Sequence, residues 1–193
     1  STQASFFDFD KDGDLDMFLL NHNVSPVNTN NPENFKNENN NLVGDKLYRN
    51  DNGKYVDISK EAGIIQNSLG FGLGVSIGDL NQDGWPDIYV SNDYIEHDYL
   101  YYNNQNGTFS EKLKSSFGHV SNFSMGTDIA DFNNDGLLDV VTLDMIAEDN
   151  YGIKTSMSGM NPKAFNHAVN NGFHYQYMYN SLQLNNGNSK FSD

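Results

Sequence analysis

Three short segments of the sequence carry acidic side chains at the same spacing. They read Asp8-Phe-Asp-Lys-Asp-Gly-Asp-Leu-Asp16, Asp79-Leu-Asn-Gln-Asp-Gly-Trp-Pro-Asp87 and Asp131-Phe-Asn-Asn-Asp-Gly-Leu-Leu-Asp139. In such a loop the side chains at positions 1, 3 and 5 turn oxygens toward one centre, glycine at position 6 permits the sharp bend, and position 9 adds a carboxylate. A ligand set made only of oxygens favours calcium over zinc or copper. The sequence therefore predicts about three Ca²⁺ sites.

The predicted calcium ligands include one residue per loop that would bind through its backbone. This residue is at position 7, where the carbonyl oxygen can join the side-chain ligands. The complete predicted set is Asp8, Asp10, Asp12, Asp14, Asp16, Asp79, Asn81, Asp83, Trp85, Asp87, Asp131, Asn133, Asp135, Leu137 and Asp139. An ordinary polar turn would explain one such segment, but three aligned copies with every ligand position filled favour metal binding.

An EF-hand is the main alternative for this spacing, and the twelfth loop position argues against it. An EF-hand places a bidentate glutamate there, whereas this chain has Leu19, Val90 and Thr142. A short apolar run follows each loop, with the length and composition of a strand. The loops are therefore expected to close β-hairpins and not to join helices.

A second recurring element follows each acidic loop. It places a turn rich in Asn and Gly between two strand-like runs, within residues 47–55, 100–109 and 182–191. Asn and Gly both accept positive φ, so these turns are typical of tight hairpins. Two hairpins per repeat make a four-stranded antiparallel sheet, which is one blade of a β-propeller. We predict an all-β, partial β-propeller of about three blades over residues 1–193, with blade units near 1–59, 69–112 and 121–193.

Two inserts separate the hairpins of the first and third units. Residues 21–46 contain an Asn-rich tract without hydrophobic periodicity, which predicts an irregular loop. In residues 145–180, Asn161 and Pro162 precede a helical run that Gly172 ends. This arrangement predicts an N-cap, a proline at the first helical position, one short helix over 163–170 and a glycine stop.

Composition restricts the kinds of partner and compartment. The net charge of −15 argues against binding to nucleic acid or anionic membranes. Asp outnumbers Glu by 20 to 6, and 11 of the Asp residues lie in the three acidic loops. The chain has no Cys, and it has no apolar run long enough to span a membrane. Calcium affinities of extracellular modules, roughly 0.1–1 mM, would require a calcium-rich compartment, so we expect an extracellular or cell-surface location.

Other residues that could bind a metal or take part in catalysis lie outside the acidic loops. The five histidines lack the paired spacing of a zinc site; they are His22, His97, His119, His167 and His174. Five carboxylates remain as candidates for a glycoside hydrolase pair; they are Asp93, Glu96, Asp98, Asp144 and Glu148. No nucleophile elbow, phosphate loop or dinucleotide fingerprint occurs, so we do not expect an enzyme.

Three tyrosines alternate along the chain at Tyr175, Tyr177 and Tyr179. The alternation favours a half-buried strand. A platform on which sugar rings stack is the alternative, because exposed aromatic faces suit pyranose rings.

The segment Phe71-Gly-Leu-Gly-Val-Ser-Ile-Gly-Asp79, continuing to Val90, resembles the FG-GAP repeat of integrin-α-type propellers, and Ser124 to Asp131 is a looser copy. The whole chain, including residues 170–178, resembles the bacterial VCBS/FG-GAP proteins that are related to cartilage acidic protein and carry ASPIC/UnbV modules. The resemblance implies a seven-bladed propeller in a larger secreted or outer-membrane-attached protein, without established catalytic residues. The chain departs from it in having only three blades and in lacking a Phe-Gly segment before the first acidic loop.

Together these observations predict a calcium-binding, extracellular or cell-surface scaffold for a glycan or protein ligand, joined to the remaining blades of a larger chain. A polysaccharide-degrading enzyme, acting as a calcium-assisted lyase or hydrolase, is the alternative from another class. An accessory subunit of an outer-membrane nutrient-uptake complex is a third possibility.

Overall fold

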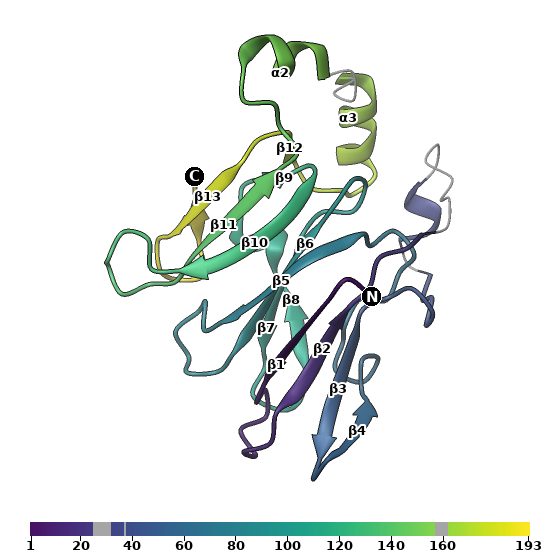
Figure 1. Ribbon diagram of the computed structural model, residues 1–193, viewed down its shortest axis with the longest axis vertical. Helices are drawn as coiled ribbons and strands as arrows, with labels where there is room; N and C mark the ends of the chain where they lie inside the picture. Colours follow the sequence, from purple (N-terminus) through teal and green to yellow (C-terminus); the bar gives the residue numbers. More distant parts are fainter. Residues whose placement is uncertain (25–31, 37, 157–161) are drawn as a thin grey trace.

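The computed structural model describes residues 1–24, 32–36, 38–156 and 162–193, and its main features are three four-stranded antiparallel sheets (Figure 1). The first contains β1 (Gln3–Phe7), β2 (Asp16–Leu20), β3 (Lys46–Asp51) and β4 (Lys54–Asp57). The second contains β5 (Gly72–Gly78), β6 (Asp87–Asn92), β7 (Tyr99–Asn103) and β8 (Phe109–Glu111). The third contains β10 (Ser124–Ala130), β11 (Asp139–Asp144), β13 (Ser181–Asn185) and β14 (Phe191–Ser192). We call these sheets blades 1, 2 and 3.

Each blade consists of the two predicted hairpins, because its strands are paired in sequence order. An acidic loop joins the first two strands, and the last ladder pair before it is Phe7 with Asp16, Gly78 with Asp87 or Ala130 with Asp139. A tight turn joins the last two strands. In blade 1 that turn has Asn52 at φ 55° and Gly53 at φ 91°, as a two-residue hairpin of right-handed twist requires. The all-β expectation of four-stranded antiparallel blades is confirmed.

The apolar core lies between neighbouring blades. One cluster of buried side chains joins blades 1 and 2, and a second joins blades 2 and 3. Strand β6 contributes to both, since Ile88 and Val90 belong to the first cluster and Tyr89 to the second. All residues of β6 are buried. Blade 2 is therefore covered on both faces, which explains why its second strand lacks the polar alternation of a strand with one face in water.

The first strands of the blades approach one another closely, with β5 beside both β1 and β10. A Cβ atom at Gly74 of β5 would lie 3.1 Å from Thr127 N and 3.2 Å from Gly126 Cα in the backbone of β10, so this close approach favours glycine.

Three α-helices and one 3₁₀ helix complete the described secondary structure. They are η1 (Pro32–Asn34), α1 (Leu113–Ser116), α2 (Asn150–Ser156) and α3 (Pro162–Asn170). Helix α3 begins at the predicted proline, and Gly172 follows it at φ 86°. The predicted N-cap, Asn161, lies outside the described residues. Helix α2 was not predicted, because its sequence combines glycine with β-branched residues that disfavour helices. The described residues of the second insert thus contain two helices, where one was predicted.

The second insert also forms a small parallel sheet, in which β12 (Gln176–Tyr177) pairs with β9 (Val120–Ser121). Helices α2 and α3 lie at the end of blade 3 that is away from its acidic loop (Figure 1). Part of the Asn-rich tract in the first insert, residues 28–31 and 37, lies outside the described residues. None of the helices in the described ranges is both long and apolar enough to span a membrane.

Candidate functional site

The three acidic loops share one backbone conformation. Positions 4 and 6 have positive φ in every loop, with values of 60° and 96°, 60° and 84°, and 61° and 86°; the residues are Lys11 and Gly13, Gln82 and Gly84, and Asn134 and Gly136. Residues other than glycine rarely adopt this conformation. The glycine bend was predicted, whereas the left-handed residue at position 4 was not.

Backbone N–H groups hold the carboxylates at positions 1 and 5. In the second loop, Asp79 Oδ1 accepts from Asp83 N at 3.0 Å and Asp79 Oδ2 accepts from Gly84 N at 2.8 Å. Asp83 Oδ1 accepts from Trp85 N at 2.8 Å. The same three hydrogen bonds occur in the first and third loops at distances of 2.8–3.1 Å. The loop backbone therefore orients these side chains.

The position-9 aspartate connects its loop to the third strand of the same blade. Asp87 is fully buried and accepts from Leu80 N and Asn103 N, both at 2.9 Å. Asp16 and Asp139 are also fully buried and make the equivalent pairs of bonds at 2.8–3.0 Å. The sequence predicted only a ligand role for these three residues, and the structure adds a framework role.

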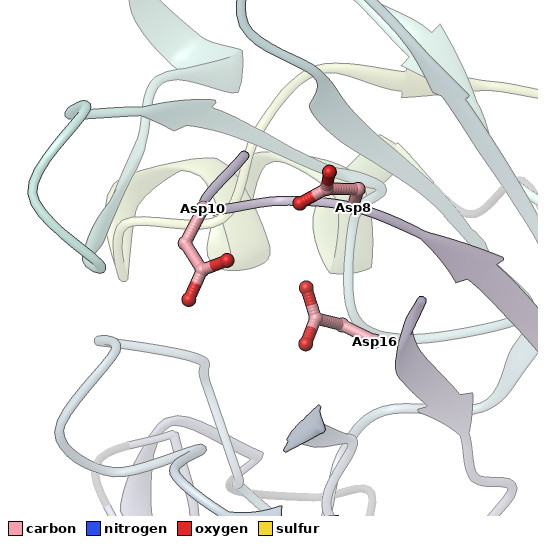
Figure 2. Close-up of side chains that lie close together, drawn as sticks. All are labelled: Asp8, Asp10 and Asp16. Carbon is pink, nitrogen blue, oxygen red and sulfur yellow. The ribbon is translucent and has the colours of Figure 1, made fainter. Parts of the chain in front are cut away.

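The first loop brings three carboxylates together. Ligand oxygens of Asp8, Asp10 and Asp16 all lie within 4.8 Å of one another, and Figure 2 shows these side chains around a common space. Burial and the nearby charges of Asp12 and Asp8 raise the pKa of Asp10. Burial also raises the pKa of Asp16. The group thus fits a hard cation, which would favour the ionised carboxylates.

In the other two loops an asparagine replaces the position-3 carboxylate. Asn81 Nδ2 donates to Asp83 Oδ2 at 3.1 Å, and Asn133 Nδ2 donates to Asp135 Oδ2 at 2.9 Å. Burial, with a smaller contribution from the charges of Asp83 and Asp79, raises the pKa of Asp87 to about 7. These loops have fewer negative charges than the first loop but the same all-oxygen donor set.

The donor set fits calcium in all three loops. When bound, Ca²⁺ would supply positive charge that offsets the repulsion among the carboxylates. At position 7, the N–H groups of Asp14, Trp85 and Leu137 donate to the position-5 carboxylates. A calcium-ligand role for their carbonyl oxygens remains a prediction, as does calcium binding itself.

Neighbouring loops contact each other through the side chains at position 4. Lys11 Nζ lies 4.3 Å from the ring centroid of Trp85, so the first loop reaches the second. Gln82 Nε2 donates to the carbonyl oxygen of Gly136 at 3.3 Å, so the second loop reaches the third. The predicted sites therefore form one connected edge of the molecule.

A comparison with known protein families matches the part of the sequence that contains the acidic loops. A sequence model described as an FG-GAP-like repeat matches residues 8–90 and again residues 79–142, and each match starts at the first aspartate of an acidic loop. The chain belongs to the FG-GAP-like repeat family. The resemblance inferred from Phe71-Gly72 and the acidic loops is thus confirmed. FG-GAP repeats usually form scaffold or binding domains.

One known protein is similar in sequence to part of this chain. Mouse cartilage acidic protein 1 is 33% identical to this FG-GAP-repeat chain over 86 residues. The matched region is 44% of this chain and 13% of the mouse protein. The chain therefore spans only a small part of that relative.

The remaining candidates do not form a second metal group within the described residues, where the only cluster of three acidic or histidine ligands is that of Asp8, Asp10 and Asp16. His97 and His174 are buried, with ring centroids 6.2 Å apart. Among the spare carboxylates, Glu96 and Asp98 are fully buried and Glu148 is exposed.

Proposed function

We propose that this chain is part of a calcium-binding β-propeller scaffold that works outside the cell or at its surface and presents a glycan- or protein-binding face. The observation that carries the proposal is the repeated loop geometry, with carboxylates held at the same positions in three adjacent blades. FG-GAP-repeat proteins are often extracellular or surface-associated, and extracellular calcium is high enough for sites of modest affinity. Further blades of a larger chain and an outer-membrane uptake complex are partners compatible with this role.

The two inserts provide the surface for a partner. They contact each other although they are far apart in sequence: Lys36 Nζ donates to the carbonyl oxygen of Gly172 at 3.0 Å and lies 4.1 Å from the ring centroid of Phe173. Both inserts leave their blades after the second strand, at the end away from the acidic loops. Calcium binding and partner binding would therefore use opposite ends of the blades.

A buried carboxylate fastens this surface to blade 2. Glu96 Oε2 accepts from Asn67 Nδ2 at 3.2 Å, and Glu96 Oε1 lies 3.7 Å from Lys36 Nζ and 2.8 Å from His97 Nδ1. Burial would raise the pKa of Glu96, but the contacts with His97 and Lys36 outweigh it and the pKa is lowered. Gln176 Nε2, from the second insert, donates to the backbone oxygen of Glu96 at 3.4 Å. The ionised side chain of Glu96 thus contacts Asn67, Lys36 and His97, and its backbone oxygen adds the contact with Gln176.

The burial of the two carboxylates Glu96 and Asp98 favours a scaffold over a polysaccharide-degrading enzyme. Asp98 is also fully buried, and it accepts from Tyr89 Oη at 2.7 Å, Asn92 N at 2.8 Å and Ser124 Oγ at 3.1 Å. Glu96 and Asp98 are engaged by protein groups and turned away from solvent, whereas a glycosidic bond must reach its two carboxylates.

Isothermal titration calorimetry with Ca²⁺, after removal of bound ions with a chelator, tests the proposal. We expect about three binding events per chain. Replacing Asp79 and Asp83 together by Ala should remove one of them, and the control Asp128→Asn, an exposed aspartate outside the loops, should keep all three. An absence of binding at millimolar Ca²⁺, or an equal loss in the control, would falsify the calcium proposal.

A further inference from the structure

Two tyrosines of the second insert face outward from a strand whose polar residues face inward. Tyr175 is 46% exposed and Tyr177 is 36% exposed, whereas His174 and Gln176 are each 8% exposed. The alternation predicted from the sequence is therefore present, but its buried side is the polar one. Large aromatic side chains left outside while polar ones are buried indicate a surface used for binding.

The inward-facing polar side chains are held by hydrogen bonds to other parts of the fold. His174 Nε2 lies 3.1 Å from the backbone oxygen of Phe117. Gln176 Nε2 donates to the backbone oxygen of Glu96 at 3.4 Å. Both partners are backbone groups of the region around blade 2, so the inner face of β12 is specified by these contacts.

The backbone around β12 is fixed as well. Val120 N donates to the carbonyl oxygen of Tyr175 at 3.0 Å, and Asn122 N donates to that of Tyr177 at 2.9 Å. A shift of one residue would exchange the two faces of the strand. These bonds define the register and so hold both tyrosines on the outer face.

The outward tyrosines belong to a cluster of rings that we call the aromatic platform. Phe165 of α3 has its ring centroid 5.6 Å from that of Tyr177, with 29° between the planes, and 6.2 Å from that of Tyr175. Tyr179 lies 6.2 Å from Tyr177, and His119 lies 5.6 Å from Tyr177 and 5.5 Å from Tyr179. The platform thus comprises Phe165, Tyr175, Tyr177, Tyr179 and His119, drawn from three separate segments of the chain.

Polar groups border the platform. His119 Nε2 lies 3.5 Å from Asp193 Oδ2, and the tyrosines carry phenolic hydroxyl groups that can donate and accept hydrogen bonds. Flat rings beside an imidazole and a carboxylate combine an apolar contact surface with hydrogen-bonding groups at its edge.

We propose that the aromatic platform binds a pyranose ring of a neutral glycan. A pyranose has an apolar C–H face that can pack on an aromatic ring and equatorial hydroxyl groups that can bond to carboxylate, imidazole and phenol groups. The net charge of −15 and the nearby Asp193 disfavour a polyanionic glycan. Rigid tyrosines offer this contact area at little entropic cost. The inference names the ligand class for the partner face of the proposed function and so rests on that function.

Affinity electrophoresis of the 193-residue protein tests the inference, in native gels that contain a β-glucan, a xylan, a galactomannan or, as a polyanionic comparison, a pectin. We expect retardation by at least one of the three neutral polysaccharides. Tyr175→Ala and Tyr177→Ala should weaken that binding at least about tenfold, as expected for aromatic residues at the centre of an interface. Tyr177→Phe preserves the ring and should retain most of the binding.

The matched control is Tyr55→Ala, because Tyr55 has a similar exposure of 42% but lies on β4, away from the platform. Melting temperatures of all variants establish that they are folded. The inference is overturned if none of the neutral polysaccharides retards the protein, if retardation survives Tyr177→Ala, or if only pectin retards the protein. Selective binding of a proline-rich peptide by the platform would overturn it as well. Calcium titration of the same protein is independent of these results, so failure of the glycan inference is distinguishable from failure of the calcium scaffold.

Discussion

Asn103 connects blade 2 to the acidic loop of blade 1, because its Nδ2 donates to the backbone oxygen of Phe9 at 2.8 Å. Asn185 makes the same contact one blade later, donating to the oxygen of Leu80 at 2.9 Å. Phe9 and Leu80 both occupy position 2 of an acidic loop. The asparagine that ends the third strand of one blade thus binds the acidic loop of the preceding blade, and loop conformation is coupled to blade packing.

Replacing Asn103 by Ala should lower the free energy of unfolding by about 1–3 kcal/mol, because the buried carbonyl of Phe9 loses its hydrogen-bond donor. Asn50→Ala is the matched control: Asn50 makes the same kind of turn contact but donates only to Leu15 O of its own blade, at an exposed position. Urea unfolding compares the two variants. Equal losses would show that the contact between blades contributes nothing beyond the turn.

Position 9 and position 5 of the acidic loops should respond differently to loss of charge. Asp87→Asn leaves one of two buried N–H groups without an oxygen acceptor, so it should destabilise the protein by about 1–3 kcal/mol with or without calcium. Asp83→Asn can keep the bond from Trp85 N, and the two donors that lose their acceptor, Asn81 Nδ2 and Gln105 Nε2, are exposed and can bond to water. This variant should therefore lower the melting temperature in calcium much more than in chelator. Thermal melts in chelator and in millimolar calcium separate these effects. A calcium-independent loss in Asp83→Asn would contradict this division of roles.

The buried carboxyl group of Asp45 should make stability depend on pH. Burial raises the pKa of Asp45 to about 7 from a usual value near 3.8, although Asn21 N donates to the carboxyl group. Between about pH 4 and pH 7 the folded state therefore binds a proton that the unfolded state has lost, so stability falls progressively over this range and levels off above about pH 7. Its full size is up to about 4 kcal/mol.

Asp45→Asn should remove that contribution, and blade 3 indicates that the replacement fits, since Asn180 Oδ1 accepts from Asp144 N at 2.8 Å in the corresponding place. The gain in stability of the variant over the parent should be about 2–3 kcal/mol larger at pH 8 than at pH 5. Urea midpoints at the two pH values measure the difference. If the stability difference between the variant and the parent is the same at pH 5 and at pH 8, Asp45 does not titrate in this range.

The bend of the acidic loops gives a prediction about backbone strain alone. Gly136 has φ 86°, and an added Cβ would have no atom within 4 Å. Gly136→Ala should therefore cost about 1–2 kcal/mol through the left-handed conformation only. Gly118 also has open space around it but no positive φ in that range, so Gly118→Ala should be close to neutral. Chemical denaturation measures both, and equal costs would contradict the explanation.

The acidic loops and hairpins could be predicted because each pattern occurs three times and both are local in sequence. The two asparagines that join neighbouring blades, Asn103 and Asn185, were also visible in the sequence, where they end the third strands of blades 2 and 3. Their role could not be inferred, because the partner carbonyl group belongs to another blade and carries no side-chain signal.

Features of the second insert were harder to predict. Helix α3 has clear start and stop signals, whereas α2 has neither a run of residues with high helix propensity nor a proline at its start. The tyrosine alternation correctly indicated two faces around β12, but it could not show that the tyrosines lie on the exposed face. The burial of His174 and Gln176 depends on backbone acceptors that fold into place from distant segments.

The most direct test of the calcium scaffold is the melting temperature of the purified chain in chelator and in about 1 mM Ca²⁺, with Mg²⁺ at the same ionic strength as the control. Affinities of roughly 0.1–1 mM would stabilise each loop by about 0.4–1.4 kcal/mol, and a chain of this size gains roughly 2–4 °C per kcal/mol. The account predicts that calcium raises the melting temperature by several degrees and that magnesium does so much less. Identical melting temperatures in chelator and in calcium would contradict it.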